Sequence, residues 1–399
     1  MRWEKFEFHY KNNIAYRDFV TNQAGRKPTA WDEIPILTKK WLQQPLKEVI
    51  TTGLRSGDLY ISNTSGSSGH PFFFAKDKFC HALTWALNID RYRLHGIEYG
   101  DSLQARFYGV SLDINKNLSE RLKDFISARN RFNVFDLSDS ALDGFIEKFS
   151  ATKFDYINGY TSVLVVFAKH LINKNLVLKE ICPTLKVAIT TSEVLDVSDR
   201  ALLKKGFGVP VINEYGASEL DIIAFEDKDN DWIISNENIF VEIIDGDGSK
   251  VFDGQDGRII VTSLHNRAMP FIRYEIGDTG IISQRRKGIY QILESLQGRT
   301  NDVIVLPGGK KAPGLTFYYI SKKLLEEGGF IKEFIIKQKS INHFHFEYVA
   351  DSDLSDKTVD QIKKAMDEYL ELGLKVTFSR FDKLERNKAG KLMHFQREF

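Results

Sequence analysis

The first 57 residues carry polar and apolar positions at a spacing typical of helices. Residues 34–39, Ile-Pro-Ile-Leu-Thr-Lys, form a pattern that predicts a turn leading into one of these helices. A short strand-like run at 59–62 then meets a loop of small residues, and helical spacing returns over 75–95. We therefore expect a mostly helical N-terminal segment, one strand, and a loop rich in serine and glycine.

Between residues 100 and 225, apolar strand-like runs alternate with helical patterns, and two of these runs are 187–190 and 210–213. Such alternation is typical of layered α/β proteins. The most apolar stretch, 160–172, is too short to cross a bilayer and contains Lys169, so it predicts a buried helix.

The sequence pattern changes between residues 232 and 292. Short β-rich runs separated by Asp-Gly turns predict an antiparallel sheet or a small barrel there. A domain boundary is expected at 298–302, followed by a compact α+β domain of ordinary size. That domain is predicted from helical spacing at 315–327 and 355–372 and from strand-like runs at 330–337, 343–349 and 375–381. The predicted class is α/β, with a large N-terminal α/β domain (1–300) that includes a β-rich subdomain, and a small C-terminal α+β domain (301–399).

Composition agrees with a globular chain of two or three domains, since 399 residues exceed one ordinary core. The net charge of +1 gives no field that would attract nucleic acid or an anionic membrane. Cys80 and Cys182 have no Cys-x-x-Cys spacing, which fits a reducing compartment and not a disulfide framework. The opening residues lack the apolar run of a signal peptide. We expect a cytoplasmic protein without membrane insertion or a nucleic-acid partner.

The first chemical signal is the segment Asn63-Thr64-Ser65-Gly66-Ser67-Ser68-Gly69-His70-Pro71. Its glycines let the backbone approach a ligand closely, and its hydroxyls and N–H groups can surround phosphate oxygens. It is not a GxxxxGK[ST] phosphate loop. A solvated linker is the alternative, although the segment is short and lies between two apolar runs.

This loop resembles the ATP-phosphate loop of the adenylate-forming superfamily, which comprises acyl-CoA synthetases, peptide-synthetase adenylation domains and luciferases. Four further segments resemble motifs of that superfamily in the expected order. They are Asn213-Glu214-Tyr215-Gly216-Ala217-Ser218-Glu219, Arg273-Tyr274-Glu275-Ile276-Gly277-Asp278, Gly298-Arg299-Thr300-Asn301-Asp302 and Gly390-Lys391. The N-terminal part and the turn at 34–39 are most similar to the phenylacetate-CoA ligase branch, which includes relatives encoded with capsular polysaccharide genes.

The resemblance implies that a carboxylate attacks the α-phosphorus of ATP and expels pyrophosphate, with Mg²⁺ as the metal. The loop residues Thr64, Ser65, Gly66, Ser67, Ser68 and Gly69 would hold the β- and γ-phosphates. Glu219 would bind Mg²⁺, a hard cation that takes carboxylate and phosphate oxygens. Ser218 would reach the α-phosphate.

The resemblance further implies that Tyr215, between Glu214 and Gly216 in the same nucleotide-binding segment, flanks or stacks on adenine. Asp278 would accept hydrogen bonds from both ribose hydroxyls. Arg299 would support the ribose side, and Lys391 would bridge the acyl carboxylate and the α-phosphate as a compact charge on a flexible stem. The segment around Asn301 would be the hinge of a mobile C-terminal lid domain.

Three functional hypotheses remain open on these residues. The leading one is an acyl- or aryl-CoA ligase, with coenzyme A as co-substrate. The second passes the acyl group to a carrier protein or to an amine, and the third is an inactive nucleotide-binding protein on the same fold. The acid pocket is expected between residues 108 and 192 from the family layout. In or next to this range, five aromatic residues fit a flat acid and a hydrophobic core equally well: Phe107, Tyr108, Tyr156, Tyr160 and Phe167.

Other conspicuous groups favour a structural interpretation. His343 and His345 lie on one face of a predicted strand without a third metal ligand nearby. The basic run 285–287 before Gly288 is expected to be a solvated turn. Single carboxylates such as Glu219 and Asp278 are surface acids by default, so their functional assignment rests on the motifs taken together.

Overall fold

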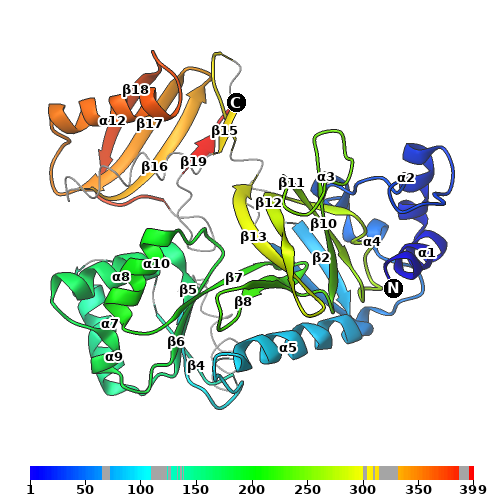
Figure 1. The fold of residues 1–399 in the computed structure, drawn as a ribbon, viewed down its shortest axis with the longest axis horizontal. Helices are drawn as coiled ribbons and strands as arrows, with labels where there is room; N and C mark the ends of the chain where they lie inside the picture. Colours follow the sequence, from blue (N-terminus) through cyan, green and yellow to red (C-terminus); the bar gives the residue numbers. More distant parts are fainter. Residues whose placement is uncertain are drawn as a thin grey trace. The chain divides into compact units, whose positions relative to one another are not determined.

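The computed structural model describes residues 1–64, 72–108, 124, 127–132, 134, 137, 139–299, 303–308, 311–313, 331–385 and 395–399. The chain divides into two compact units. One comprises Met1–Ile276 and Gly280–Leu296, and the other comprises Gly277–Thr279 and Gln297–Phe399. The predicted α/β class is confirmed, since helices and large sheets alternate along the chain (Figure 1).

The N-terminal segment is helical, as expected, with helices α1 (Arg2–Asn12), α2 (Ile14–Ala24), α3 (Lys39–Leu42) and α4 (Leu46–Val49). Asn13 starts α2 because its side chain accepts a hydrogen bond from the Tyr16 N–H, which satisfies one of the unpaired donors of the first turn. The turn at 34–39 leads into α3, and its Leu37 N–H donates to the Arg273 carbonyl at 3.0 Å. This contact attaches the N-terminal segment to the β-rich part of the first unit.

Strands β1 (Leu59–Thr64) and β2 (Phe72–Asp77) form an antiparallel pair, in which Thr64 is opposite Phe72. Helix α5 (Lys78–Arg93) follows directly, so the helix expected from residue 75 begins three residues later. The Asp77 side chain caps it by accepting from the Cys80 N–H at 3.1 Å. Residues 75–77 are strand instead, because they pair with residues 59–61.

An eleven-stranded sheet, most of whose residues belong to the first unit, has the strand order β10-β11-β12-β13-β9-β8-β7-β6-β5-β3-β4. Its parallel part consists of β4 (Arg129–Arg131), β3 (Gln104–Phe107), β5 (Tyr156–Tyr160), β6 (Val187–Thr191) and β7 (Val211–Ala217). The remaining strands are β8 (Asp221–Glu226), β9 (Trp232–Ile234), β10 (Ile239–Ile244), β11 (Asp256–Ser263), β12 (Tyr274–Lys287) and β13 (Tyr290–Arg299). The strands of the β-rich segment 232–292 therefore belong to the same sheet as the parallel strands. Antiparallel pairs form at β7–β8, β8–β9, β9–β13 and β10–β11.

Helices cover both faces of the parallel strands. On one face pack α7 (Asp139–Ala151), α8 (Thr161–Asn173), α9 (Leu178–Ile181) and α10 (Val197–Phe207), which gather beside β5 and β6 in Figure 1. On the other face, Leu87 and Tyr92 of α5 pack against Ile189 and Ile212. The apolar run at 160–172 is the buried helix α8, as predicted. Because both faces are covered, the carboxyl ends of these strands are the place where polar side chains can reach a ligand.

The second unit holds a four-stranded sheet in the order β18-β17-β16-β19 and the helix α12 (Asp356–Tyr369). Its strands are β16 (Ile331–Ser340), β17 (His343–Ala350), β18 (Lys375–Phe381) and β19 (Phe395–Arg397), and a short pair joins β14 (Val303–Val305) to β15 (Lys311–Pro313). Ser355 caps α12 through the Thr358 N–H. The helix predicted at 315–327 lies outside the described residues. Among the described residues, no helix combines the length and apolarity that spanning a membrane requires.

Candidate active site

The serine- and glycine-rich loop connects two paired strands. Thr64 is the last residue of β1 and Phe72 the first of β2, and the two face each other across the pair. Ser65, Gly66, Ser67, Ser68 and Gly69 lie outside the described residues. A segment between two hydrogen-bonded partners is short and anchored at both ends, unlike a linker between domains.

The second motif forms the end of β7 and its turn into β8. Gly216 is required there, because a Cβ atom at this position would lie 2.4 Å from the Asp221 carbonyl oxygen. Tyr215 is buried with its ring edge-on to Trp232, at 6.1 Å between centroids. Ser218 is exposed, whereas Glu219 is only 6% exposed, although it lies in a turn. A buried carboxylate in a tight turn is a costly arrangement that points to a use for its charge.

Glu219 is held by the third motif. The Tyr274 hydroxyl donates a hydrogen bond to its Oε1 at 2.9 Å, across 55 residues of sequence. Tyr274 opens β12, and four residues further along the same strand comes Asp278, which is 8% exposed. Two of the segments identified in the sequence are therefore in direct contact.

The start of β12 is itself rigid. Arg273 adopts a φ of 47°, and its guanidinium donates to the carbonyls of Asp32 and Ile34 at 3.0 and 2.8 Å. It also pairs with the buried Glu242 at 3.1 Å. These contacts fix the backbone from which Tyr274 reaches Glu219.

A buried lysine that the sequence interpretation did not identify supports the same turn. Lys76 lies on β2 and is 2% exposed, and its ammonium donates to the Ser218 carbonyl at 3.1 Å and pairs with Asp221. Thr84 of α5 donates to the other carboxylate oxygen of Asp221 at 2.5 Å. Lys76 follows the buried Phe74 by two residues and shares its face of the strand, but the run of three phenylalanines before it does not mark that face in the sequence. The strand that leaves the serine- and glycine-rich loop is thus connected to the turn that carries Ser218 and Glu219.

Replacing Lys76 by methionine is expected to lower the free energy of unfolding by about 3 kcal/mol, because it leaves the largely buried Asp221 carboxylate without its counterion. Denaturant unfolding monitored by tryptophan fluorescence measures the change. Lys78→Met is the matched control, since the Lys78 side chain is 71% exposed and its contact with Asp58 spans 3.7 Å. A Lys76→Met protein as stable as the Lys78→Met protein would contradict this role.

The side chain of Glu214 lies on the opposite face of β7 from that of its neighbour Tyr215. Side chains alternate along a strand, and Glu214 accepts a hydrogen bond from the hydroxyl of Tyr92 on α5 at 3.0 Å. Arg299 is the last residue of β13, and its side chain lies outside the described part of the structure. Lys391 lies outside the described residues, as does Asn301. Among the predicted site residues, Ser218 and Glu219 lie in one turn of the first unit. Strand β2, which follows the serine- and glycine-rich loop, contacts this turn through Lys76.

The aromatic residues of the expected acid pocket divide into two groups. Phe107 and Phe167 are completely buried in the core beneath α7 to α10, with their rings 5.8 Å apart. Tyr108 and Tyr160 contact each other at the carboxyl ends of β3 and β5, with their ring centroids 4.8 Å apart. Tyr156 lies edge-on to Tyr92, at 5.8 Å between ring centroids. His343 and His345 both contact the Thr377 hydroxyl at 2.9 Å, which agrees with their structural interpretation.

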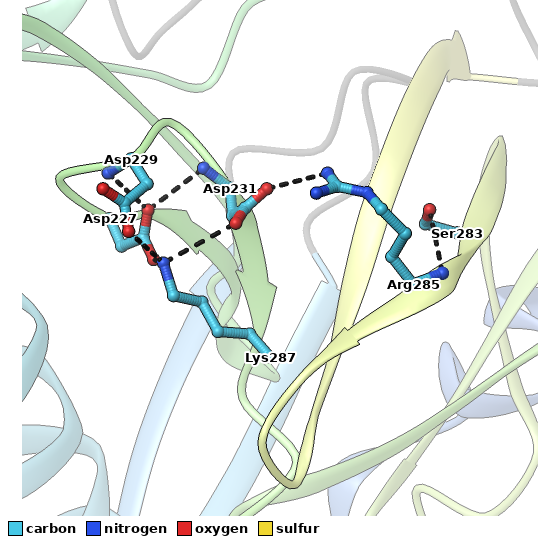
Figure 2. Close-up of polar contacts among 6 residues, drawn as sticks. All are labelled: Asp227, Asp229, Asp231, Ser283, Arg285 and Lys287. Carbon is cyan, nitrogen blue, oxygen red and sulfur yellow. Dashed lines mark hydrogen bonds and ion pairs between the residues drawn. The ribbon is translucent and has the colours of Figure 1, made fainter.

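The basic run 285–287 does more than form a turn. Figure 2 shows Lys287 facing the acidic loop after β8, where it pairs with Asp227, with Asp229 at 2.6 Å and with Asp231 at 3.6 Å. Arg285 also pairs with Asp231, at 2.9 Å. The expectation of a merely solvated turn was therefore incomplete: these cations attach the β12–β13 hairpin to the loop between β8 and β9.

A hollow of about 690 Å³ lies beside this cluster. Its lining includes Glu226, Asp231, Trp232 and Arg285, and none of the predicted site residues that the structure describes contributes to it. The carboxylates of Glu226 and Asp231 are already paired with Arg200 and Arg285. The hollow is therefore distinct from the chemistry that the motifs imply.

No protein-family model matches the sequence. Protein CapK of Staphylococcus aureus is 24% identical over 321 residues, which cover 76% of this chain and 67% of that protein. Phenylacetate-coenzyme A ligase of Aromatoleum evansii is 28% identical over 131 residues, and the match covers 31% of this chain and 30% of the ligase.

Among solved structures, 2-hydroxyisobutyryl-CoA ligase in its postadenylation state, in complex with R3-HIB-AMP, superposes with a TM-score of 0.72. The match is 15% identical and covers 98% of this chain and 87% of that one, so it establishes the fold. The sequence relatives and the fold agree with the order of the motifs: the chain is similar to the phenylacetate-CoA ligase-like branch of the adenylate-forming superfamily.

Proposed function

We propose that this protein activates a carboxylic acid with ATP and transfers the acyl group to the thiol of coenzyme A. In the first step a carboxylate oxygen forms a bond to the α-phosphorus, and the bond from that phosphorus to the bridging oxygen breaks, so pyrophosphate leaves. In the second step the thiol sulfur bonds to the acyl carbon and AMP departs. Both anions of the first step repel each other, so cations and N–H donors matter more than acid–base groups.

One observation carries the proposal. The 2.9 Å hydrogen bond from Tyr274 to Glu219 joins two motif segments that are far apart in the sequence. Lys76, from the strand that follows the serine- and glycine-rich loop, donates to Ser218 in the same turn. An inactive relative would gain nothing from keeping a carboxylate buried at this junction.

The roles follow from the positions. The exposed Ser218 is assigned to the α-phosphate, and Tyr215, held edge-on against Trp232, to adenine. Asp278 and Arg299 are assigned to the ribose, and the loop from Thr64 to residue 69 to the outer phosphates. Lys391 is assigned to the acyl carboxylate and the α-phosphate. The lid role of residues 301–399 is part of the same proposal.

Glu219 fits a magnesium ligand. The Tyr274 hydroxyl occupies its Oε1, and among the described residues no hydrogen bond or ion pair reaches its Oε2. Mg²⁺ usually binds through one or two carboxylates together with substrate phosphates and water, so one carboxylate is sufficient here. When bound, Mg²⁺ neutralises charge on the phosphates, while Glu219 orients the ion and Tyr274 orients Glu219.

The test is ATP–pyrophosphate exchange with a panel of carboxylic acids, followed by addition of acceptors. Exchange with at least one acid supports adenylation, and thioester formation on addition of coenzyme A supports the ligase. Exchange without a thioester would direct the second step to a carrier protein or to an amine. Absence of exchange with every acid would contradict the proposal.

A further inference from the structure

A polar layer lies between α5 and the carboxyl ends of the parallel strands. The strand register places Tyr160 opposite Thr191 and Thr191 opposite Glu214. Because side chains alternate, Arg106 and Tyr108 follow the same face from the neighbouring strand β3. Deeper on this face Ile189 and Ile212 pack against α5, and the buried amides of Gln104 and Asn158 contact each other. The polar layer lies at the edge where open α/β sheets bind ligands.

Glu214 is the acidic group of this layer. It accepts the hydrogen bond from Tyr92, and burial raises its pKa above the ordinary value for glutamate, although hydrogen bonds with Tyr92 and Thr191 and the charge of Arg106 oppose the rise. Among the described residues, the Glu214 carboxyl group is held by hydroxyl donors, and no cation lies within ion-pair distance of it.

Arg106 is the basic group, and within the described part of the chain its side chain makes no hydrogen bond. Its Nε is buried without an acceptor, and its guanidinium lies over the Tyr108 ring at 4.3 Å from the centroid. Within the described part of the chain it forms no ion pair within 4.0 Å. The neighbouring strand offers a contrast, since Arg129 and Arg131 both pair with Asp124, at 2.5 and 2.7 Å. A buried arginine donor without an acceptor is costly unless a ligand supplies one.

An arginine can only donate, whereas an ionised carboxylate can only accept. A hydroxyl group meets both requirements, because its oxygen accepts from Arg106 and its hydrogen can be donated to Glu214. Tyr108 and Tyr160 supply aromatic surface beside this pair. A hydrocarbon group at the same place would leave the Arg106 Nε without an acceptor and would add no donor to the Glu214 carboxylate.

We propose that Arg106 and Glu214 select the acid substrate, so that the enzyme activates carboxylic acids that carry a hydroxyl group remote from the reacting carboxyl. The proposal rests on the proposed adenylation and narrows its substrate to hydroxylated acids, aromatic ones included. Under this proposal Glu214 contacts the acid substrate, whereas the motif resemblance had assigned it to nucleotide binding. Sites built to hydrogen-bond a substrate hydroxyl reject the analogue that lacks it by a large factor, because their buried polar groups are left unpaired.

The experiment compares matched acids with the full chain. The pairs are 4-hydroxyphenylacetate with phenylacetate and with 4-methylphenylacetate, and 4-hydroxybenzoate with benzoate, together with ω-hydroxy and unsubstituted aliphatic acids. Two readouts are taken: kcat/KM from ATP–pyrophosphate exchange, and acid binding by calorimetry in the absence of ATP. The hydroxylated member of at least one pair is expected to be favoured by about a hundredfold or more.

Arg106→Met should lower kcat/KM for the favoured hydroxylated acid by about a hundredfold and leave its unsubstituted partner nearly unchanged. Arg106→Lys should restore part of the preference, since it restores a donor. Arg129→Met is the control, because Arg129 is satisfied by Asp124, and it should affect both members of a pair equally.

Equal use of both members of every pair, or a preference that survives Arg106→Met, would overturn the selection while leaving adenylation intact. Exchange with no acid, together with calorimetric binding of a hydroxylated acid that depends on Arg106, would reject the proposed function and retain the selection. If neither readout distinguishes the pairs, the selection is wrong.

Discussion

Replacing Glu219 by glutamine is expected to slow Mg²⁺-dependent acyl-AMP formation by about a thousandfold, with the fold intact. The charge is lost, but the amide oxygen can still accept the hydrogen bond from Tyr274, which the wild-type Oε1 accepts at 2.9 Å. Because the turn keeps its contacts to Lys76 and Tyr274, the loss should be confined to the metal. Pyrophosphate release at several Mg²⁺ concentrations measures the effect, and circular dichroism verifies the fold.

Tyr274→Phe is the matched control for orientation. It keeps the carboxylate and removes only the hydroxyl that positions it, so we expect a loss of about tenfold. The decisive result is that Glu219→Gln slows acyl-AMP formation more than Tyr274→Phe does. If Glu219→Gln is folded and releases pyrophosphate at nearly the normal rate, the metal role assigned to Glu219 is wrong.

Lys391→Ala is expected to lower acyl-AMP formation by about a hundredfold or more, while supplied acyl-AMP is still converted to thioester. The reason is that its charge is assigned to the acyl carboxylate and α-phosphate, which matter only in the first half-reaction. Asn301→Pro should do the reverse, since proline fixes φ and would stiffen the hinge about which the lid is proposed to turn. Assaying the two half-reactions separately distinguishes the variants.

Lys388→Ala is the control for Lys391, because it lies three residues earlier in the same segment. It should be nearly silent in both half-reactions. Equal loss of both half-reactions in Lys391→Ala would refute the division of labour. A severe effect of Lys388→Ala beside a mild one of Lys391→Ala would transfer the assignment to the other lysine.

Much of the fold was predictable from local patterns. The strands at 187–190 and 343–349 and the helix at 355–372 appear in the structure within a few residues of their predicted bounds, because periodicity and capping act over neighbouring residues. The resemblance to the adenylate-forming superfamily was equally visible in the sequence, since the motifs that carry it are short contiguous segments. The helix start near residue 75 was placed too early, because pairing with β1 makes residues 75–77 strand.

Contacts across the chain were decided only in three dimensions. The sequence identified Glu219 and the segment of Tyr274 separately, but their hydrogen bond depends on how β7 and β12 are placed in one sheet. Lys76 was not identified from the sequence, and its role appears only because β2 directs its side chain toward Ser218 and Asp221. Strand register likewise places Arg106 and Glu214 on the same face of the sheet, and no local sequence pattern predicts that they share it. The sequence by itself determined which chemical groups the chain carries and where most of its helices and strands lie. The tertiary structure decided which of these groups contact each other, because burial and strand pairing join residues that are far apart in the sequence, and no local pattern predicts such contacts.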